Sequence, residues 1–92
     1  MRSAESEVSV AVRALRTRLC ESQQAFAYRM RTAVRTIARY EANRPPKGLM
    51  LLVFLTAAVT TGEAELAEIF RRALHDEIRR IGLTPSAARK VL

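Results

Sequence analysis

The chain has 92 residues, of which 49% are hydrophobic and 27% are charged, and its formal net charge is +7. This length and composition indicate a single globular domain over residues 1–92 that can form one compact core. The longest apolar run, residues 49–59, is much shorter than the roughly 20 residues of a membrane-spanning helix. Residues 1–12 contain no apolar block of the kind found in secretory signals. We therefore expect a cytoplasmic protein with no membrane partner.

The first 30 residues have the apolar spacing of two helices. Four apolar residues at spacings of four, three and four predict a helix over about 7–20; they are Val8, Val12, Leu15 and Leu19. Ser22 is expected to cap a second helix, which ends near Met30 and packs through Phe26 and Ala27. Cys20 is the only cysteine, so it cannot form an internal disulfide. We expect it to be a reduced thiol that fills a small apolar space at a helix end.

A third helix is expected to begin at Thr32, as its N-cap, and to run to about Glu41. A helical wheel divides it into two sides. The side expected to face the core carries Ala33, Ile37, Tyr40 and Glu41, and the outer side carries Val34, Arg35, Ala38 and Arg39. The outer side therefore has two arginines one turn apart beside small or short apolar side chains.

Residues 42–47 are expected to form a loop, because Pro45 and Pro46 prevent helix continuation and Asn43 suits a left-handed position after a helix. Residues 48–60 are apolar nearly all round and predict a central, buried helix. Gly62 is expected to end that helix.

The last third of the chain predicts one long helix and one short helix. The long helix, about 63–81, has an apolar stripe of seven residues: Leu66, Ile69, Phe70, Ala73, Leu74, Ile78 and Ile81. Thr84 followed by Pro85 predicts a short sixth helix over 85–91. No strand pattern is visible, so the predicted fold class is all-α.

The positive charge is concentrated in one half of the chain. Residues 10–50 contain nine basic and two acidic side chains, whereas the remaining residues contain seven of each. This asymmetry indicates a polyanionic partner. The two short helices at about 22–30 and 32–41, joined by one or two residues, have the spacing of a helix-turn-helix.

Residues 22–46, SQQAFAYRMRTAVRTIARYEANRPP, resemble the helix-turn-helix of lambda-repressor-like (Cro and XRE-type) DNA-binding domains. The residues that match the family pattern are Ser22, Gln23, Phe26, Ala27, Ile37, Tyr40, Glu41, Arg44 and Pro46. The resemblance covers roughly residues 8–60, and ELAEIFRRAL at residues 65–74 is similar to the tail of a bacterial subgroup. It implies a five-helix bundle that binds duplex DNA, with residues 63–92 used for packing or dimerisation.

The resemblance also implies roles for individual residues. Val34, Arg35 and Arg39 match the base-reading positions, with Arg35 expected to bind guanine O6 and N7. Five residues are expected to contact phosphates: Gln23, Arg31, Asn43, Arg44 and Lys47. Arg16 and Glu41 match a structural ion pair between the first and third helices.

The chain departs from the family pattern at two helix ends. Arg31 stands where the family usually has a turn glycine, and Cys20-Glu21 stands where Gly-Leu often ends the first helix. A left-handed backbone at a residue other than glycine costs roughly 1–2 kcal/mol. Either the turn has another geometry, or Arg31 is strained because it contacts phosphate.

The expected function is that of a prokaryotic or phage transcriptional regulator of the repressor type, associated with the nucleoid. A homodimer through helix 63–81 and the tail would place two copies of the third helix on DNA half-sites about 34–36 Å apart. The alternative is a protein-interaction module, such as an antitoxin or an accessory transcription factor. His75 has no Cys or second His at ligand spacing and no adjacent nucleophile. We therefore expect no enzyme, no metal and no cofactor.

Overall fold

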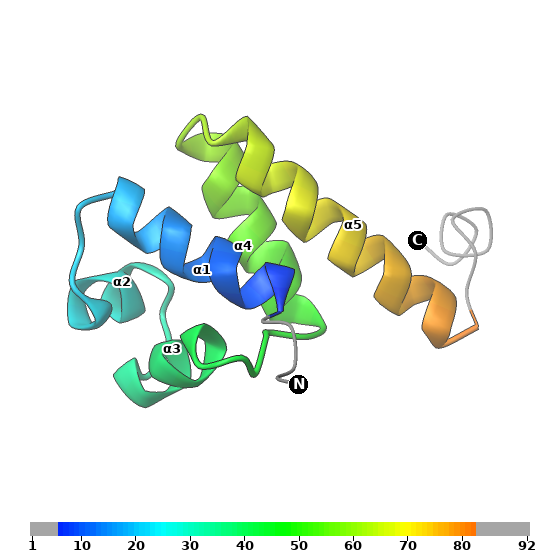
Figure 1. The fold of residues 1–92 in the computed structure, drawn as a ribbon, viewed down its shortest axis with the longest axis horizontal. Helices are drawn as coiled ribbons and strands as arrows, with labels where there is room; N and C mark the ends of the chain where they lie inside the picture. Colours follow the sequence, from blue (N-terminus) through cyan, green and yellow to red (C-terminus); the bar gives the residue numbers. More distant parts are fainter. Residues whose placement is uncertain (1–5, 83–92) are drawn as a thin grey trace, which may run out of the picture.

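The computed structural model of the chain describes residues 6–82 as five helices and no strand, which confirms the all-α prediction (Figure 1). The helices are α1 Glu7–Arg18, α2 Gln23–Arg29, α3 Val34–Glu41, α4 Leu49–Thr60 and α5 Ala64–Arg80. The short sixth helix expected over 85–91 lies outside the described residues. None of the five helices is both long and apolar enough to cross a membrane.

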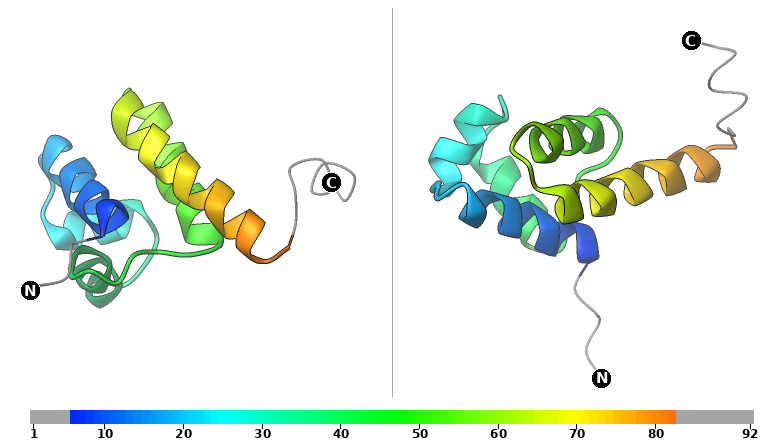
Figure 2. Two further views of the ribbon diagram at one scale, coloured as in Figure 1. Left: turned by 45° about the vertical axis from the view of Figure 1, so that its right-hand side comes forward. Right: turned by 90° about the horizontal axis from the view of Figure 1, so that it is seen from above.

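The helices form two groups that share one core. Helices α4 and α5 make a hairpin, and the end of α5 extends past the start of α4 (Figures 1 and 2). Helix α1 packs against both α5 and α3, while α2 packs against α3. The helix-turn-helix segment, α2 and α3, therefore lies at one end of the molecule, away from the end of α5 (Figure 1).

Aromatic side chains join the two groups. The ring of Phe54 on α4 lies 5.9 Å from that of Phe26 on α2 and 5.5 Å from that of Phe70 on α5, centroid to centroid. All three are fully buried, and Tyr40 on α3 meets the Phe54 ring edge-on at 5.7 Å. Such pairs add to the stabilisation from burial. The predicted core roles of Phe26 and Tyr40 are confirmed.

Helices α1, α2 and α3 each end in the same left-handed cap at a residue other than glycine. The φ angles of Cys20, Arg31 and Asn43 are 58°, 57° and 67°. In each case the next residue donates its backbone N–H to the carbonyl five positions earlier, at 3.0–3.2 Å, which is the pattern of a Schellman motif. The left-handed Asn43 is confirmed, and Arg31 does adopt the strained backbone that glycine would relieve.

Three predictions at these helix ends are wrong. Cys20 is exposed, because the cap lies past the last turn and Leu19 makes the apolar contact with the core. Thr32 does not cap α3: it lies one residue before the N-cap, and its N–H donates to the Ala27 carbonyl in the cap that closes α2. Helix α3 therefore begins later, with Ala33 as its N-cap and no side-chain hydrogen bond there, and Ala33 is exposed rather than packed on the core.

Helix α4 is not buried on all sides. It packs Leu51, Phe54 and Ala58 into the core, but Leu49 and Val59 are 74% and 56% exposed. The prediction of a central helix is wrong because α4 lies at the surface of the bundle and the other described helices cover only one of its sides.

Candidate nucleic-acid interface

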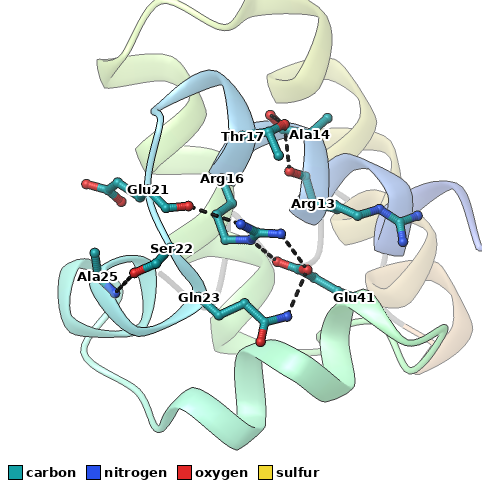
Figure 3. Close-up of polar contacts among 9 residues, drawn as sticks. All are labelled: Arg13, Ala14, Arg16, Thr17, Glu21, Ser22, Gln23, Ala25 and Glu41. Atoms are coloured by element: carbon teal, nitrogen blue, oxygen red, sulfur yellow. Dashed lines mark hydrogen bonds and ion pairs between the residues drawn. The ribbon is translucent and has the colours of Figure 1, made fainter.

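An ion pair holds α3 against α1 (Figure 3). The Arg16 guanidinium donates from Nε to Glu41 Oε2 at 2.6 Å and from Nη2 to Oε1 at 3.1 Å. It also donates from Nη1 to the Glu21 backbone carbonyl at 3.0 Å. Glu41 is only 7% exposed, and its hydrogen bonds raise the pKa of Arg16 above its ordinary value. The predicted ion pair between Arg16 and Glu41 is present, and it fixes α3 relative to the bundle.

Gln23, at the start of α2, belongs to the same network. Its amide Nε2 donates to Glu41 Oε1 at 3.1 Å (Figure 3). The amide nitrogen carries two N–H donors, so this bond leaves one for the phosphate contact expected from the sequence. Ser22 caps the helix as predicted, accepting from the Ala25 N–H at 3.1 Å.

The outward side of α3 carries the three residues expected to read bases. Val34 is 46% exposed, and Arg35 and Arg39 are both exposed. The opposite side of the helix packs against the bundle, since Ile37 is fully buried and Glu41 is nearly so. The structure therefore brings Val34, Arg35 and Arg39 together on one accessible side, as the helical wheel predicts.

Eight of the nine basic side chains of residues 10–50 fall into two groups. Arg16, Arg18 and Arg29 are each ion-paired, with Glu41, Glu63 and Glu21 respectively. The hydrogen bonds from Arg29 lower the pKa of Glu21. The second group is exposed and has no acidic partner among residues 6–82: Arg31, Arg35, Arg39, Arg44 and Lys47. This second group comprises the basic side chains that the resemblance places at DNA.

The loop after α3 holds the remaining expected phosphate contacts. Arg44 and Lys47 are exposed there, as is Asn43. The Asn43 side-chain oxygen accepts a hydrogen bond from the backbone N–H of Ser6. The NH₂ group of the same amide takes no part in that bond and can still donate two hydrogen bonds. This contact ties the loop to the residue that caps α1.

A shallow concavity of about 710 Å³ lies between the end of α2 and the start of α3. Arg31 lines it, and so does the Ala33 cap, where the first N–H groups of α3 have no side-chain acceptor. Free N–H groups at a helix start, beside an arginine, favour an anion such as phosphate.

Tyr28 is a candidate contact that the sequence analysis missed. It lies on α2, lines the same concavity and is 88% exposed. A phenol hydroxyl can donate to a phosphate oxygen. The signal was an aromatic residue on the polar side of a helix, followed by Arg29 and Arg31.

Comparisons of the chain with protein-family models, curated proteins and solved structures give no match.

Proposed function

We propose that the protein binds duplex DNA by inserting the outward side of α3 into the major groove. It acts as a transcriptional regulator of the repressor type, at the nucleoid, and is a binding protein rather than an enzyme. The resemblance at residues 22–46 suggested this function, and the geometry of the described residues supports it.

The observation that carries the proposal is the division of the basic side chains. Where an arginine serves the fold, as Arg16 does, it has a carboxylate partner at close range. The five basic residues on α3, in the turn before it and in the loop after it have none within the described chain. Unpaired cations on one accessible side suit a row of phosphates, which release bound counterions when the protein neutralises them.

The chemistry of α3 suits base recognition. The Arg35 guanidinium has the planar fork of donors that matches guanine O6 and N7, and the short Val34 side chain suits a thymine methyl group. Arg39, one turn further along, reads a second base or holds a phosphate. Gln23, Arg31, Asn43, Arg44 and Lys47 position the helix through the backbone.

A single α3 has only three base-reading side chains, too few for high specificity. A two-fold dimer would place two copies of α3 on half-sites about 34–36 Å apart, or on a multiple of that spacing. The sequence assigns dimerisation to α5 and the tail. Ile81, at the described end of α5, is 67% exposed, and the tail lies outside the described residues.

The test is selection of bound sites from random duplex DNA, followed by affinity measurements on the selected sites across a range of salt concentrations. We expect an enriched sequence with two-fold symmetry and an affinity that falls steeply with salt, by roughly one unit of log–log slope per phosphate neutralised. No duplex binding even at low salt, together with a tight complex with another protein, would instead favour the protein-interaction module.

A further inference from the structure

Glu77 on α5 is hydrogen-bonded to the loop that carries two of the expected phosphate-binding cations. Its carboxylate accepts the backbone N–H of Gly48 through both oxygens, each at 2.9 Å. Gly48 directly follows Lys47 and is the N-cap residue of α4. Figure 2 shows the loop running from α3 to the start of α4, beside the last turns of α5. Glu77 therefore connects the last helix to the end of this loop.

The two ends of the loop are held by different parts of the chain. At the first end, the Arg44 N–H donates to the Arg39 carbonyl at 3.2 Å, so the cap of α3 fixes the backbone at Arg44. At the second end, Gly48 has no side chain with which to cap α4, and its φ angle is 59°. The contact that holds its N–H comes from Glu77, on a distant helix.

Lys47 lies between two fixed neighbours. Pro46 before it is buried, and its ring fixes its own φ angle. Gly48 after it belongs to the residue type with the greatest backbone freedom, so the Glu77 carboxylate restrains the point at which the chain could most easily turn. A concavity of about 240 Å³ separates parts of the loop from the end of α5, with Lys47 among its lining residues. Close packing alone therefore does not hold Lys47.

We propose that Glu77 is a positioning residue for DNA binding, which holds the backbone at Lys47 so that the exposed ammonium group meets a phosphate. This inference rests on the proposed function. Glu77 itself does not contact DNA, because its carboxylate is bound to the chain and would repel phosphate. A loop that is already ordered avoids the loss of conformational freedom that binding would otherwise require.

Net charge and loop position make opposite predictions for Glu77→Ala. Removal of a carboxylate makes the net charge of +7 more positive by one unit, which by itself strengthens binding to a polyanion. Loss of the Gly48 contact releases Lys47 and weakens binding. We expect the second effect to dominate, with affinity falling roughly three- to tenfold at about 0.1 M salt and the log–log salt slope losing about one phosphate contact. The loss should be alike for all sequences, because phosphate contacts do not distinguish bases.

The test compares the affinity of the wild type, Glu77→Ala and Glu77→Gln for the selected duplex over a range of salt concentrations. Glu77→Gln keeps an oxygen that accepts the Gly48 N–H, so it should bind at least as tightly as the wild type. The matched control is Asp76→Ala, because Asp76 is the exposed neighbour of Glu77 and loses the same charge. Asp76→Ala should bind as the wild type does or slightly more tightly.

Double variants identify the cation through which Glu77 acts. In a chain that carries Lys47→Ala, Glu77→Ala should cause little further loss of affinity, since the contact is already absent. In a chain that carries Arg44→Ala, Glu77→Ala should cause its full loss, because the cap of α3 holds that arginine independently.

Two further measurements separate loop position from general unfolding. Amide hydrogen exchange without DNA should show that the Gly48 N–H loses protection in Glu77→Ala and keeps it in Glu77→Gln. Glu77→Asp keeps the net charge but has a shorter side chain, so it should also lose protection at Gly48 and bind DNA more weakly.

The failure of this inference differs from the failure of the proposed function. If the wild type binds duplex DNA and Glu77→Ala binds it equally well, Glu77 has no positioning role and DNA binding stands. The same conclusion follows if Glu77→Ala causes the same loss with Lys47→Ala as with Arg44→Ala, since Glu77 would then act on the fold as a whole. A wild type that binds no duplex would contradict both proposals.

Discussion

At the scale of single residues, the left-handed caps at Cys20 and Arg31 allow a test of whether backbone strain serves the fold alone or also DNA binding. Cys20 and Arg31 have nearly the same φ angle, 58° and 57°, in the same type of helix cap. Replacing such a residue by glycine removes the backbone strain in the folded state but also gives the unfolded chain more freedom. The net gain in stability is roughly 1 kcal/mol or slightly less. We expect both Cys20→Gly and Arg31→Gly to raise the free energy of unfolding by this amount, measured by urea denaturation.

The same two substitutions should differ in DNA binding. Arg31→Gly removes a cation from the concavity at the start of α3, so duplex affinity should fall and the salt dependence should lose about one phosphate contact. Cys20→Gly should bind DNA as the wild type does. If Arg31→Gly gained stability and kept full affinity, the left-handed arginine would have no role at phosphate.

Ser9 on α1 is a polar residue buried where an apolar one would fit. It is 0% exposed, and its hydroxyl has no hydrogen-bond partner within the described part of the chain. Burying an unpaired hydroxyl costs roughly 1–3 kcal/mol. We therefore expect Ser9→Ala to raise the free energy of unfolding by about 1 kcal/mol in urea denaturation.

The matched control for Ser9 is Ser22, whose hydroxyl caps α2 by accepting from the Ala25 N–H. Ser22→Ala should lower stability by about 1 kcal/mol, since it removes a helix cap. Loss of stability in both serine variants would mean that the Ser9 hydroxyl has a partner that stabilises the fold.

At the scale of helices, the Arg16–Glu41 pair holds α3 in place. Removing one partner of a buried pair leaves the other charge uncompensated, at a cost of about 3–5 kcal/mol. The Arg16 side chain keeps 18% exposure, so we expect Arg16→Met to cost about 3 kcal/mol, at the lower end of that range. Arg29→Met breaks the more exposed pair with Glu21 and should cost less than about 1 kcal/mol. Similar costs for the two variants in thermal or urea unfolding would contradict the structural role of Arg16.

Apolar spacing in the sequence was enough to predict most helices and the two sides of α3. Ile37 and Tyr40 face the core and Arg35 and Arg39 face outward, because a helical wheel needs only the 3.6-residue period. The start of α3 lies one residue later than predicted: Thr32 belongs to the cap that closes α2, and Ala33 takes the N-cap position although it has no side-chain acceptor. The preference of Thr for cap positions placed the start wrongly, because it contains no information about how the preceding helix ends.

The outer side of α4 could not be predicted for a different reason. A helix that is apolar nearly all round has no polar side to indicate where solvent lies, so the sequence suggested complete burial. Leu49 and Val59 are exposed because the chain supplies no further described helix to cover them. Tyr28 was missed because aromatic residues in a helix usually indicate a core, and only the structure shows that this one points outward.

At the scale of the whole molecule, the charged and the uncharged surfaces are separate. The unpaired basic residues lie on α3 and the segments on either side of it, whereas residues 48–62 carry no charge. A protein with this division can meet a polyanion on one surface and an uncharged partner on another.

The most direct test of the central claim measures the affinity of Arg35→Ala for the selected duplex and for duplexes changed at each base pair. Arg44→Ala, in the loop, serves as the comparison. We predict that Arg35→Ala loses about 1–3 kcal/mol of binding free energy and no longer discriminates at one base pair, while Arg44→Ala weakens binding to all sequences alike. An equal loss on every sequence for Arg35→Ala would contradict insertion of α3 into the major groove as a reader of bases.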